Sequence, residues 1–316
     1  MRAALSLPMM AQSSAIVRPT GLLPEQRGLG WGLIGVTAFS FTVPFTRVAA
    51  HHGLSPLFIG SGRAVVAAAL AAITLFATRQ RLPSSSQWAR LALVAGGVVV
   101  GFPLLTSYAL TQAPASHGAV VIGLLPAATA VMAVLRGKEH VPVSFWLFAA
   151  LGAVAVVTFA ALQNGGLGSL QSADLLLLGA VLAAAVGYAE GGLLARQLGS
   201  WQTVSWALLL AAPLMVALTA ISVAQARPSG TALQWLAFAY LCVVSMYLGF
   251  FAWYRGLAIG PITGVSQVQL VQPVLSILWA GVILREQLSW ATAVGGLTVI
   301  ACACSAVRTR LSRTTS

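Results

Sequence analysis

The acidic side chain of Glu190 lies inside an apolar stretch of the sequence, in "VGYAEGGLLAR" (186–196). An ionisable group within a membrane-spanning segment costs a few kcal/mol, so it marks a candidate functional residue. Three uses remain open for this carboxylate: binding the amine of a substrate, taking up a proton in exchange for substrate, or hydrogen bonding to a neighbouring helix. The helical rise places it roughly 9 Å from the nearer end of its helix.

Arg63 is the second charged residue inside an apolar segment. The helical rise puts it about 10 Å or more from Glu190 in depth, nearer the opposite membrane face, so we expect no direct pair between the two. Anchoring of the guanidinium by backbone carbonyls is the favoured expectation. Binding of a substrate carboxylate is the alternative.

Uncharged polar residues supply further candidates. Gln269 and Gln272 are three residues apart and share a helix face, and we expect them to be ligands for a polar substrate, with hydrogen bonding between helices as the alternative. Tyr108 and Tyr254 close two apolar segments, where they either contact substrate, act as gates or form an interfacial aromatic belt. The candidate substrate-binding residues are therefore Glu190, Gln269, Gln272, Tyr108, Tyr254 and Arg63, and Glu190 is also the candidate for proton coupling.

Other chemistry is weakly indicated. His117 is expected to be a satisfied residue, and the neighbours His51 and His52 have no third ligand, so no metal site is expected. The serine in "GSGR" (60–63) has no positioned base of the kind that a nucleophile requires, and no phosphate-binding loop of the form GxxxxGK[ST] occurs. We therefore expect neither an enzyme nor a cofactor. The carboxylates Glu139 and Glu286 are expected to interact with the N-terminal end of the helix that follows each, or with Lys138 and Arg285.

Composition indicates which elements must hold these residues. Of 316 residues, 59% are hydrophobic and only 7% are charged, whereas about a quarter are charged in a typical soluble domain. The apolar residues form runs of about 20, the length that spans about 30 Å of hydrocarbon as a helix. The net charge of +12 comes from basic residues between these runs, which argues against nucleic acid as a partner. The sequence therefore predicts an all-α polytopic membrane protein.

Ten membrane-spanning helices are predicted from runs bounded by charges, Pro or Gly. They cover residues 29–49, 55–77, 88–111, 116–136, 143–163, 174–195, 202–223, 233–256, 263–284 and 289–307. Residues 1–28 are predicted to be a disordered cytoplasmic tail and residues 308–316 a second cytoplasmic tail. Pro44 in the first helix and Gly191 in the sixth are expected to let those helices break near a central site.

The basic residues predict the orientation of these helices. With a cytoplasmic N-terminus, 13 of the 17 Lys and Arg residues lie on the cytoplasmic side, and both termini face the cytoplasm. Those 13 residues are Arg2, Arg18, Arg27, Arg79, Arg81, Arg90, Arg136, Lys138, Arg196, Arg255, Arg308, Arg310 and Arg313.

The chain also contains an internal repeat. When "APASHGAVVIGLLPAATAVMAVLRGKEH" (113–140) is laid over "GPITGVSQVQLVQPVLSILWAGVILREQ" (260–287), a constant offset of 147 aligns two prolines, a basic residue and a glutamate without a gap. The same offset places the first helix over the sixth, so each half has five helices. Because five is odd, the halves must enter the membrane from opposite sides. Such inverted repeats are typical of secondary transporters that bind substrate between the halves.

These two segments, together with "WGLIGVTAFSFTVPFTRVA" in the first helix and "SGRAVVAAALAAITLF" around Arg63, resemble the paired signature of the EamA-type family of the drug/metabolite transporter superfamily. The resemblance assigns residues 29–165 to a first EamA repeat and 172–307 to a second. It implies an inner-membrane carrier, commonly an exporter of amino acids or other small metabolites, with a cavity lined by helices one, three, four, six, eight and nine. Glu190 is not part of the shared signature.

The expected function is therefore secondary transport out of the cell, with proton exchange as one form of coupling. Drug or toxic-compound efflux and uncoupled facilitated movement are the alternatives. The expected partners are a small-molecule substrate and the lipid bilayer of the inner (plasma) membrane, with a homodimer left open.

Overall fold

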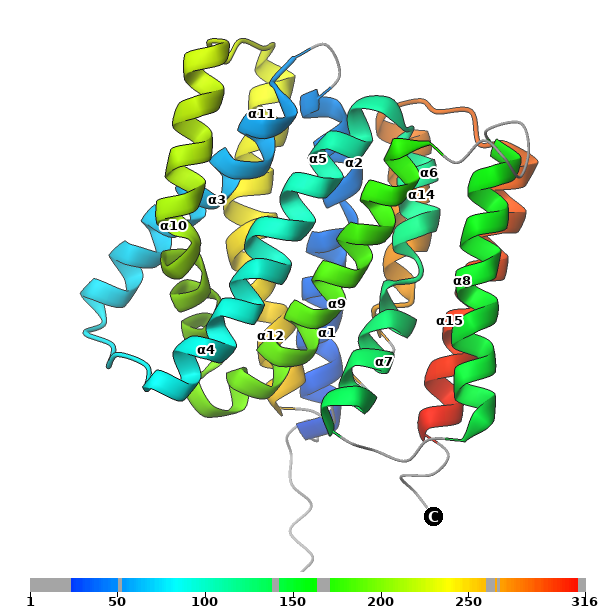
Figure 1. Cartoon of the computed structure of the whole chain (residues 1–316), viewed down its shortest axis with the longest axis horizontal. Coiled ribbons are helices and arrows are strands. Elements are labelled where there is room, and N and C mark those ends of the chain that lie inside the picture. The colour runs from blue at the N-terminus through cyan, green and yellow to red at the C-terminus, as the bar shows by residue number, and fades with distance from the viewer. Residues whose placement is uncertain are drawn as a thin grey trace, which may run out of the picture.

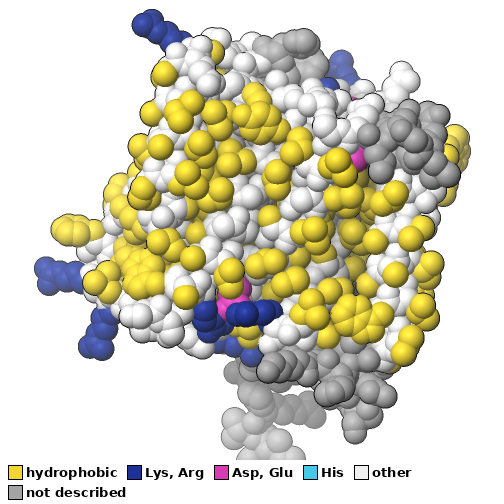
Figure 2. Space-filling view, viewed as in Figure 1, with side chains coloured by type: hydrophobic (Ala, Val, Ile, Leu, Met, Phe, Trp, Pro, Cys, Tyr) yellow, Lys and Arg dark blue, Asp and Glu magenta, His cyan; other side chains and the backbone are white. Residues whose placement is uncertain are grey.

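The computed structural model describes residues 24–50, 53–137, 142–163, 171–259, 265 and 268–311, and within these ranges every regular element is a helix (Figure 1). Seven helical segments are long and apolar enough to cross a membrane, and three shorter apolar helices bring the count to ten. The predicted all-α architecture of ten helices is thus confirmed. Figure 2 shows hydrophobic side chains spread over most of the viewed face, with Lys and Arg side chains near its margins.

The first repeat contains spans one to five. In order they are α1 (Pro24–Ser40) with α2 (Thr42–Ala50); α3 (Pro56–Ala77); α4 (Ser85–Val94), η1 (Ala95–Gly101) and α5 (Phe102–Gln112); α6 (Ala115–Ile122) with α7 (Leu125–Gly137); and α8 (Val143–Gln163). The start of α3 shows how sequence sets a boundary. Ser55 accepts a hydrogen bond from the Phe58 N–H, and Pro56 occupies the first turn, where its missing N–H costs nothing.

The second repeat contains spans six to ten. They are α9 (Ser172–Leu198); α10 (Ser200–Gln225); α11 (Ala232–Tyr240), η2 (Leu241–Leu248) and α12 (Gly249–Ile259); α14 (Val271–Ile283); and α15 (Trp290–Leu311). The first helix α1 begins at Pro24, five residues before the predicted start of the first span. Residues 1–23, and with them most of the predicted N-terminal tail, lie outside the described residues.

The two repeats are inverted with respect to each other. In Figure 1, α1 starts and α15 finishes at the lower end of the bundle, which we call the termini end, and the opposite end is the far end. The first helix of each repeat runs the opposite way: α1 leaves the termini end, whereas α9 leaves the far end and runs toward the termini end.

The helix packing follows this inverted symmetry. The repeat mates α3 and α10 pack together, as do the mates α8 and α15. The packing of α1 on α12 in one half of the bundle corresponds to that of α9 on α5 in the other. Spans from the two repeats therefore pack against each other across the centre, and the interface between the repeats passes through the middle of the molecule.

Irregular segments occur at matching places in the two repeats. The wider π-helical turns η1 (95–101) and η2 (241–248) coincide at the offset of 147, and helix interruptions at 123–124 and 269–270 nearly coincide, each a few residues before a proline. Such wider turns are rare and occur frequently at functional sites. Interrupted helices expose backbone groups near substrate in many transporters. The irregular segments therefore indicate a functional site near the centre of spans three, four, eight and nine.

The first span is interrupted and the sixth span is continuous. The first span is interrupted at Phe41, between α1 and α2, as expected from the nearby Pro44. The expected break at Gly191 is wrong, because α9 is continuous from Ser172 to Leu198. Gly191 instead makes room for Tyr254, whose hydroxyl would lie 2.2 Å from a Cβ at position 191. The glycine is needed for close packing of α9 on α12.

Candidate functional site

A cavity lies at the centre of the bundle, between the repeats. Its lining residues are Phe39, Thr42, Arg63, Val98, Phe102, Pro103, Ala184, Tyr188, Ser245, Met246, Phe250 and Gln272. Two pairs among them are repeat mates at the offset of 147: Val98 with Ser245, and Pro103 with Phe250. The cavity is therefore near the pseudo-symmetry axis, and both π-helical segments contribute to its wall.

The cavity is small in this conformation. About 20 Å³ of it admits the centre of a water molecule, which is room for about one water. It is lined by spans one, two, three, six, eight and nine. Compared with the expectation from the resemblance, span four is absent from the wall and Arg63 of span two is present. A ligand larger than a water molecule would fit only if the helices moved apart.

The Arg63 side chain is buried, with 1% of its surface exposed. One of its terminal nitrogens donates a long hydrogen bond of 3.4 Å to the Thr106 hydroxyl. Its Nε atom has no hydrogen-bond partner among the described residues. These contacts do not include the backbone carbonyls that the sequence favoured as anchors for Arg63. As expected, Arg63 and Glu190 do not pair with each other.

Gln272 lies on the cavity wall and Gln269 lies one turn before it. Both side chains are buried, and the Oε1 atom of Gln272 and both amide atoms of Gln269 are unpartnered among the described residues. Unsatisfied buried amides are costly, so such groups generally meet water or a ligand. The third glutamine of this span, Gln267, lies outside the described residues.

Two hydroxyl groups face each other across the repeat interface at the cavity. Thr42 Oγ1 and Ser245 Oγ are 2.8 Å apart and join the first span to the eighth. The aromatic rings of Phe39, Tyr188 and Phe250 form an adjoining wall, with the centroids of Phe39 and Phe250 4.9 Å apart. The cavity thus combines one cation, a few neutral polar groups and a large apolar surface.

The two tyrosines chosen from the sequence lie elsewhere. Tyr254 is fully buried and its hydroxyl donates to the Gly187 carbonyl at 3.2 Å, which fixes α12 against α9. Tyr108 has 40% of its surface exposed, near the far end of α5. Neither residue lines the central cavity, whereas Tyr188, which the sequence reading passed over, does.

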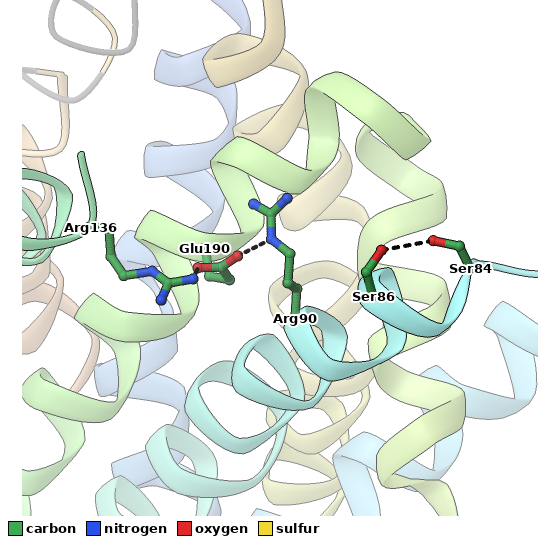
Figure 3. A network of polar contacts seen from close by, with 5 residues as sticks. All are labelled: Ser84, Ser86, Arg90, Arg136 and Glu190. Atoms are coloured by element: carbon green, nitrogen blue, oxygen red, sulfur yellow. Dashed lines mark hydrogen bonds and ion pairs between the residues drawn. The ribbon is translucent and has the colours of Figure 1, made fainter. Parts of the chain in front are cut away.

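Glu190 lies toward the termini end, apart from the lining of the central cavity, and its side chain is 1% exposed. Figure 3 shows it between Arg90 and Arg136. One carboxylate oxygen accepts from Arg90 Nε of α4, and the other accepts from a terminal nitrogen of Arg136 of α7 at 2.5 Å. Both arginines are partly exposed, at 26% and 45% of their side-chain surfaces. The carboxylate of the second repeat therefore joins two helices of the first. We call these three residues the Glu190 cluster.

Two further contacts join the repeats at the far end. His117 Nε2 and Asp174 Oδ1 are 2.7 Å apart in a buried pair, so His117 is satisfied as expected. The Glu286 carboxylate accepts from the N–H groups of Ala115 and Ser116 at 2.8 and 2.9 Å, at the first turn of α6. The expected attraction of Glu286 to the N-terminus of the following helix is wrong, because the N-terminus that it contacts is that of α6 in the other repeat. The helix that follows Glu286, α15, is not the one it contacts.

The three carboxylates that the structure describes share one property. Asp174, Glu190 and Glu286 all belong to the second repeat, and each binds groups of the first. Two of them act at the far end and one at the termini end. The side chains of Glu25 and Glu139, and of Lys138 and the pair His51 and His52, lie outside the described residues.

Comparisons with known proteins give a consistent picture. The sequence profile of the EamA-like transporter family matches residues 26–161 and again residues 171–307. The uncharacterized transporter YdeK of Bacillus subtilis (strain 168) is 43% identical over 281 residues, which cover 88% of this chain and 97% of that protein. A crystal structure described only as that of a protein superposes with a TM-score of 0.63 at 19% identity, covering 92% of this chain and 99% of the other, and so supports the fold.

Proposed function

The chain belongs to the EamA-like transporter family of the drug/metabolite transporter superfamily, and from this membership we propose that it is a secondary carrier that exports amino acids or similar small polar metabolites. It is a multi-pass membrane transporter and not an enzyme. The observation that carries the proposal is the small cavity between inverted repeats, where Arg63 and Gln272 have buried polar atoms without partners among the described residues. Transporters of this architecture bind substrate at such an interface.

Movement would follow from the placement of the contacts between the repeats. The Glu190 cluster closes the termini end, and the Glu286 and His117 contacts close the far end. Opening one set while the other stays closed would expose the cavity to one side of the membrane at a time. We place the protein in the plasma (inner) membrane with both termini cytoplasmic, since 13 of the 17 basic residues then face the cytoplasm.

Proton exchange through Glu190 is the finer part of the proposal. Both carboxylate oxygens are held by arginines in the described conformation, so a proton would reach Glu190 only when the termini end opens. Glu190 would then link protonation to opening without touching the substrate. Among the other sequence candidates, Gln272 and Arg63 are the substrate ligands that the cavity favours, with Gln269 behind them. The positions of Tyr108 and Tyr254 favour packing roles.

A vesicle experiment tests transport itself. Purified protein in liposomes is expected to move a radiolabelled amino acid mixture with saturable kinetics, at rates below those of a channel. Ion currents without saturable flux would contradict the carrier proposal.

The coupling is tested by imposing a pH gradient across the same vesicles. Glu190→Gln is expected to remove the dependence of flux on the gradient, and Glu286→Gln, an equivalent change at the far end, is expected to keep it. Both variants must first give monodisperse protein in detergent. Unchanged dependence in Glu190→Gln would leave Glu190 with a structural role alone.

Efflux of drugs or toxic organic compounds is the second candidate function, and the aromatic wall of Phe39, Tyr188 and Phe250 favours it. Uncoupled facilitated movement is the corresponding alternative to proton exchange. A screen of metabolite and drug sensitivity in a deletion strain separates the two substrate classes, because each predicts a different set of toxic compounds.

A further inference from the structure

The guanidinium of Arg63 has more hydrogen-bonding capacity than its surroundings use. Arginine carries five N–H donors and stays charged in proteins. Here the one hydrogen bond found among the described residues goes to Thr106 at 3.4 Å, and that hydroxyl already donates to the Phe102 carbonyl at 2.6 Å. Arg63 as a whole is 1% exposed, so bulk water does not compensate for the missing partners. Buried charges in proteins are normally paired.

No carboxylate among the described residues pairs with Arg63. Asp174, Glu190 and Glu286 bind partners at the two ends of the bundle. The cavity wall therefore holds a positive charge whose partner must come from elsewhere.

The remaining wall groups suit the rest of such a partner. Thr42 and Ser245 share one hydrogen bond, which leaves the second hydroxyl hydrogen free to donate to an incoming acceptor. The rings of Phe39, Tyr188 and Phe250 give an apolar surface beside these donors. No acidic side chain lines the cavity among the described residues, so a compound with net positive charge finds no counter-charge there.

We infer that Arg63 binds a carboxylate group of the transported molecule inside the central cavity, with the apolar part of that molecule against the aromatic wall. The inference rests on the proposed carrier function and names its substrate class: small carboxylates of zero or negative net charge, including zwitterionic amino acids. Arg63 suits this role because its planar fork of donors matches a carboxylate in a bidentate arrangement. Cationic drugs are excluded from the class.

Binding is measured on the full chain purified in detergent, through ligand-induced shifts of its melting temperature and quenching of tryptophan fluorescence. The probes are matched pairs that differ only at the acid: L-leucine with L-leucinamide, and 4-methylpentanoate with 4-methylpentanamide. The carboxylates are expected to bind at least about tenfold more tightly than the amides. Equal binding within each pair, or no binding of either carboxylate, overturns the inference.

Variants then assign the effect to Arg63. Arg63→Gln is expected to abolish the preference for carboxylates, and Arg63→Lys to retain part of it, because lysine keeps the charge but loses the fork of donors. Arg227→Gln is the matched control, since Arg227 is exposed and away from the cavity, and it should behave as wild type. A carboxylate preference that persists in Arg63→Gln overturns the assignment.

A second variant covers the case in which Arg63→Gln does not fold. Gln272→Glu keeps Arg63 and adds a carboxylate to the same cavity wall, where the two side chains can pair. This variant is expected to melt higher than wild type in the absence of ligand and to lose carboxylate binding. Retention of wild-type carboxylate affinity in Gln272→Glu contradicts the inference.

Inorganic anions test whether the site accepts anions in general, and flux measurements test the carrier function separately. Chloride and inorganic phosphate are tested alone, and a shift of equal size with either would mean a general anion site and overturn the carboxylate assignment. Saturable flux of a labelled compound without carboxylate selectivity would overturn the inference and leave the carrier function standing. Carboxylate-selective binding without any flux in liposomes would overturn the carrier function and leave only a carboxylate-binding site at Arg63, so the two failures are distinguishable.

Discussion

The two ends of the bundle hold the repeats together with different chemistry. At the termini end, the Glu190 carboxylate binds two guanidinium groups, whereas at the far end Glu286 binds two backbone N–H groups and Asp174 binds His117. The first arrangement relies on full charges from flexible side chains. The second relies largely on the fixed start of helix α6. A carrier whose ends open in turn would therefore meet two energetic barriers of different origin.

Charge pairs and helix-end contacts respond differently to substitution. Removing one partner of a buried ion pair leaves an uncompensated charge, while removing a carboxylate from a helix N-terminus leaves N–H groups that water can reach when the end opens. The comparison predicts that substitutions at the termini end destabilise the protein more than equivalent substitutions at the far end. Four experiments, ordered by the largest effect expected in each, test or refine this difference.

Glu190→Gln is expected to have the largest effect. It removes the charge that holds both arginines, and we expect a loss of about 3 kcal/mol in the free energy of unfolding. Unfolding by SDS in mixed micelles measures the loss. A cysteine placed near Glu190 should at the same time become more reactive to a water-soluble maleimide. A loss no greater than that in Glu286→Gln would contradict the proposed difference between the ends.

Arg90→Gln and Arg136→Gln measure separately how much each arginine of the Glu190 cluster contributes to stability. Arg90 is the less exposed partner, at 26% against 45%, so its removal is expected to cost about 2 kcal/mol and that of Arg136 about 0.5 kcal/mol. The same SDS titration reports both values. The reverse order would show that exposure does not rank the two pairs.

Glu286→Gln is expected to cost about 1 kcal/mol, in the range of the loss of a helix cap. The amide keeps one oxygen acceptor for the N–H groups of Ala115 and Ser116 but loses the charge that favours a helix N-terminus. A maleimide-reactive cysteine at the far end, beside α6, should become more accessible while one at the termini end does not. Equal changes at both ends would indicate that the ends do not open separately.

Salt is expected to have a small effect, no larger than that of Arg136→Gln. Raising ionic strength from about 0.1 M to about 1 M shortens the screening length from roughly 10 Å to 3 Å. The ion pairs between Glu190 and its partly exposed arginines should then stabilise the closed termini end less, by about 0.5 kcal/mol. The contacts at the far end should weaken by a smaller amount. Maleimide reactivity at the two ends, compared at both salt concentrations, measures the difference. A larger salt effect at the far end would refute the assignment of charge chemistry to the termini end.

Much of the fold could be predicted from the sequence because lipid imposes a strong constraint. Each span must be apolar over a fixed length, so hydropathy locates the ten helices, and the offset of 147 then requires the inversion. The interruptions were only partly predictable. Pro44 marked the break at Phe41, but Gly191 served a packing contact, and a glycine alone does not distinguish the two roles.

The candidate site was harder to predict, for a physical reason. Helical rise gives the depth of a residue such as Glu190 but not which helices lie beside it, and its partners Arg90 and Arg136 are 100 and 54 residues away in sequence. The π-helical turns η1 and η2 add one residue to a turn without changing composition, so hydropathy does not reveal them. Their coincidence at the repeat offset becomes visible only with the backbone in hand.

The placement of the described acids in one repeat has a consequence for the equivalence of the two halves. In a pair made of two second repeats, Glu190 would face the counterparts of Arg90 and Arg136, which are Ala237 and Ile283. Its buried charge would have no cation beside it. The two halves have thus become complementary, and neither can substitute for the other.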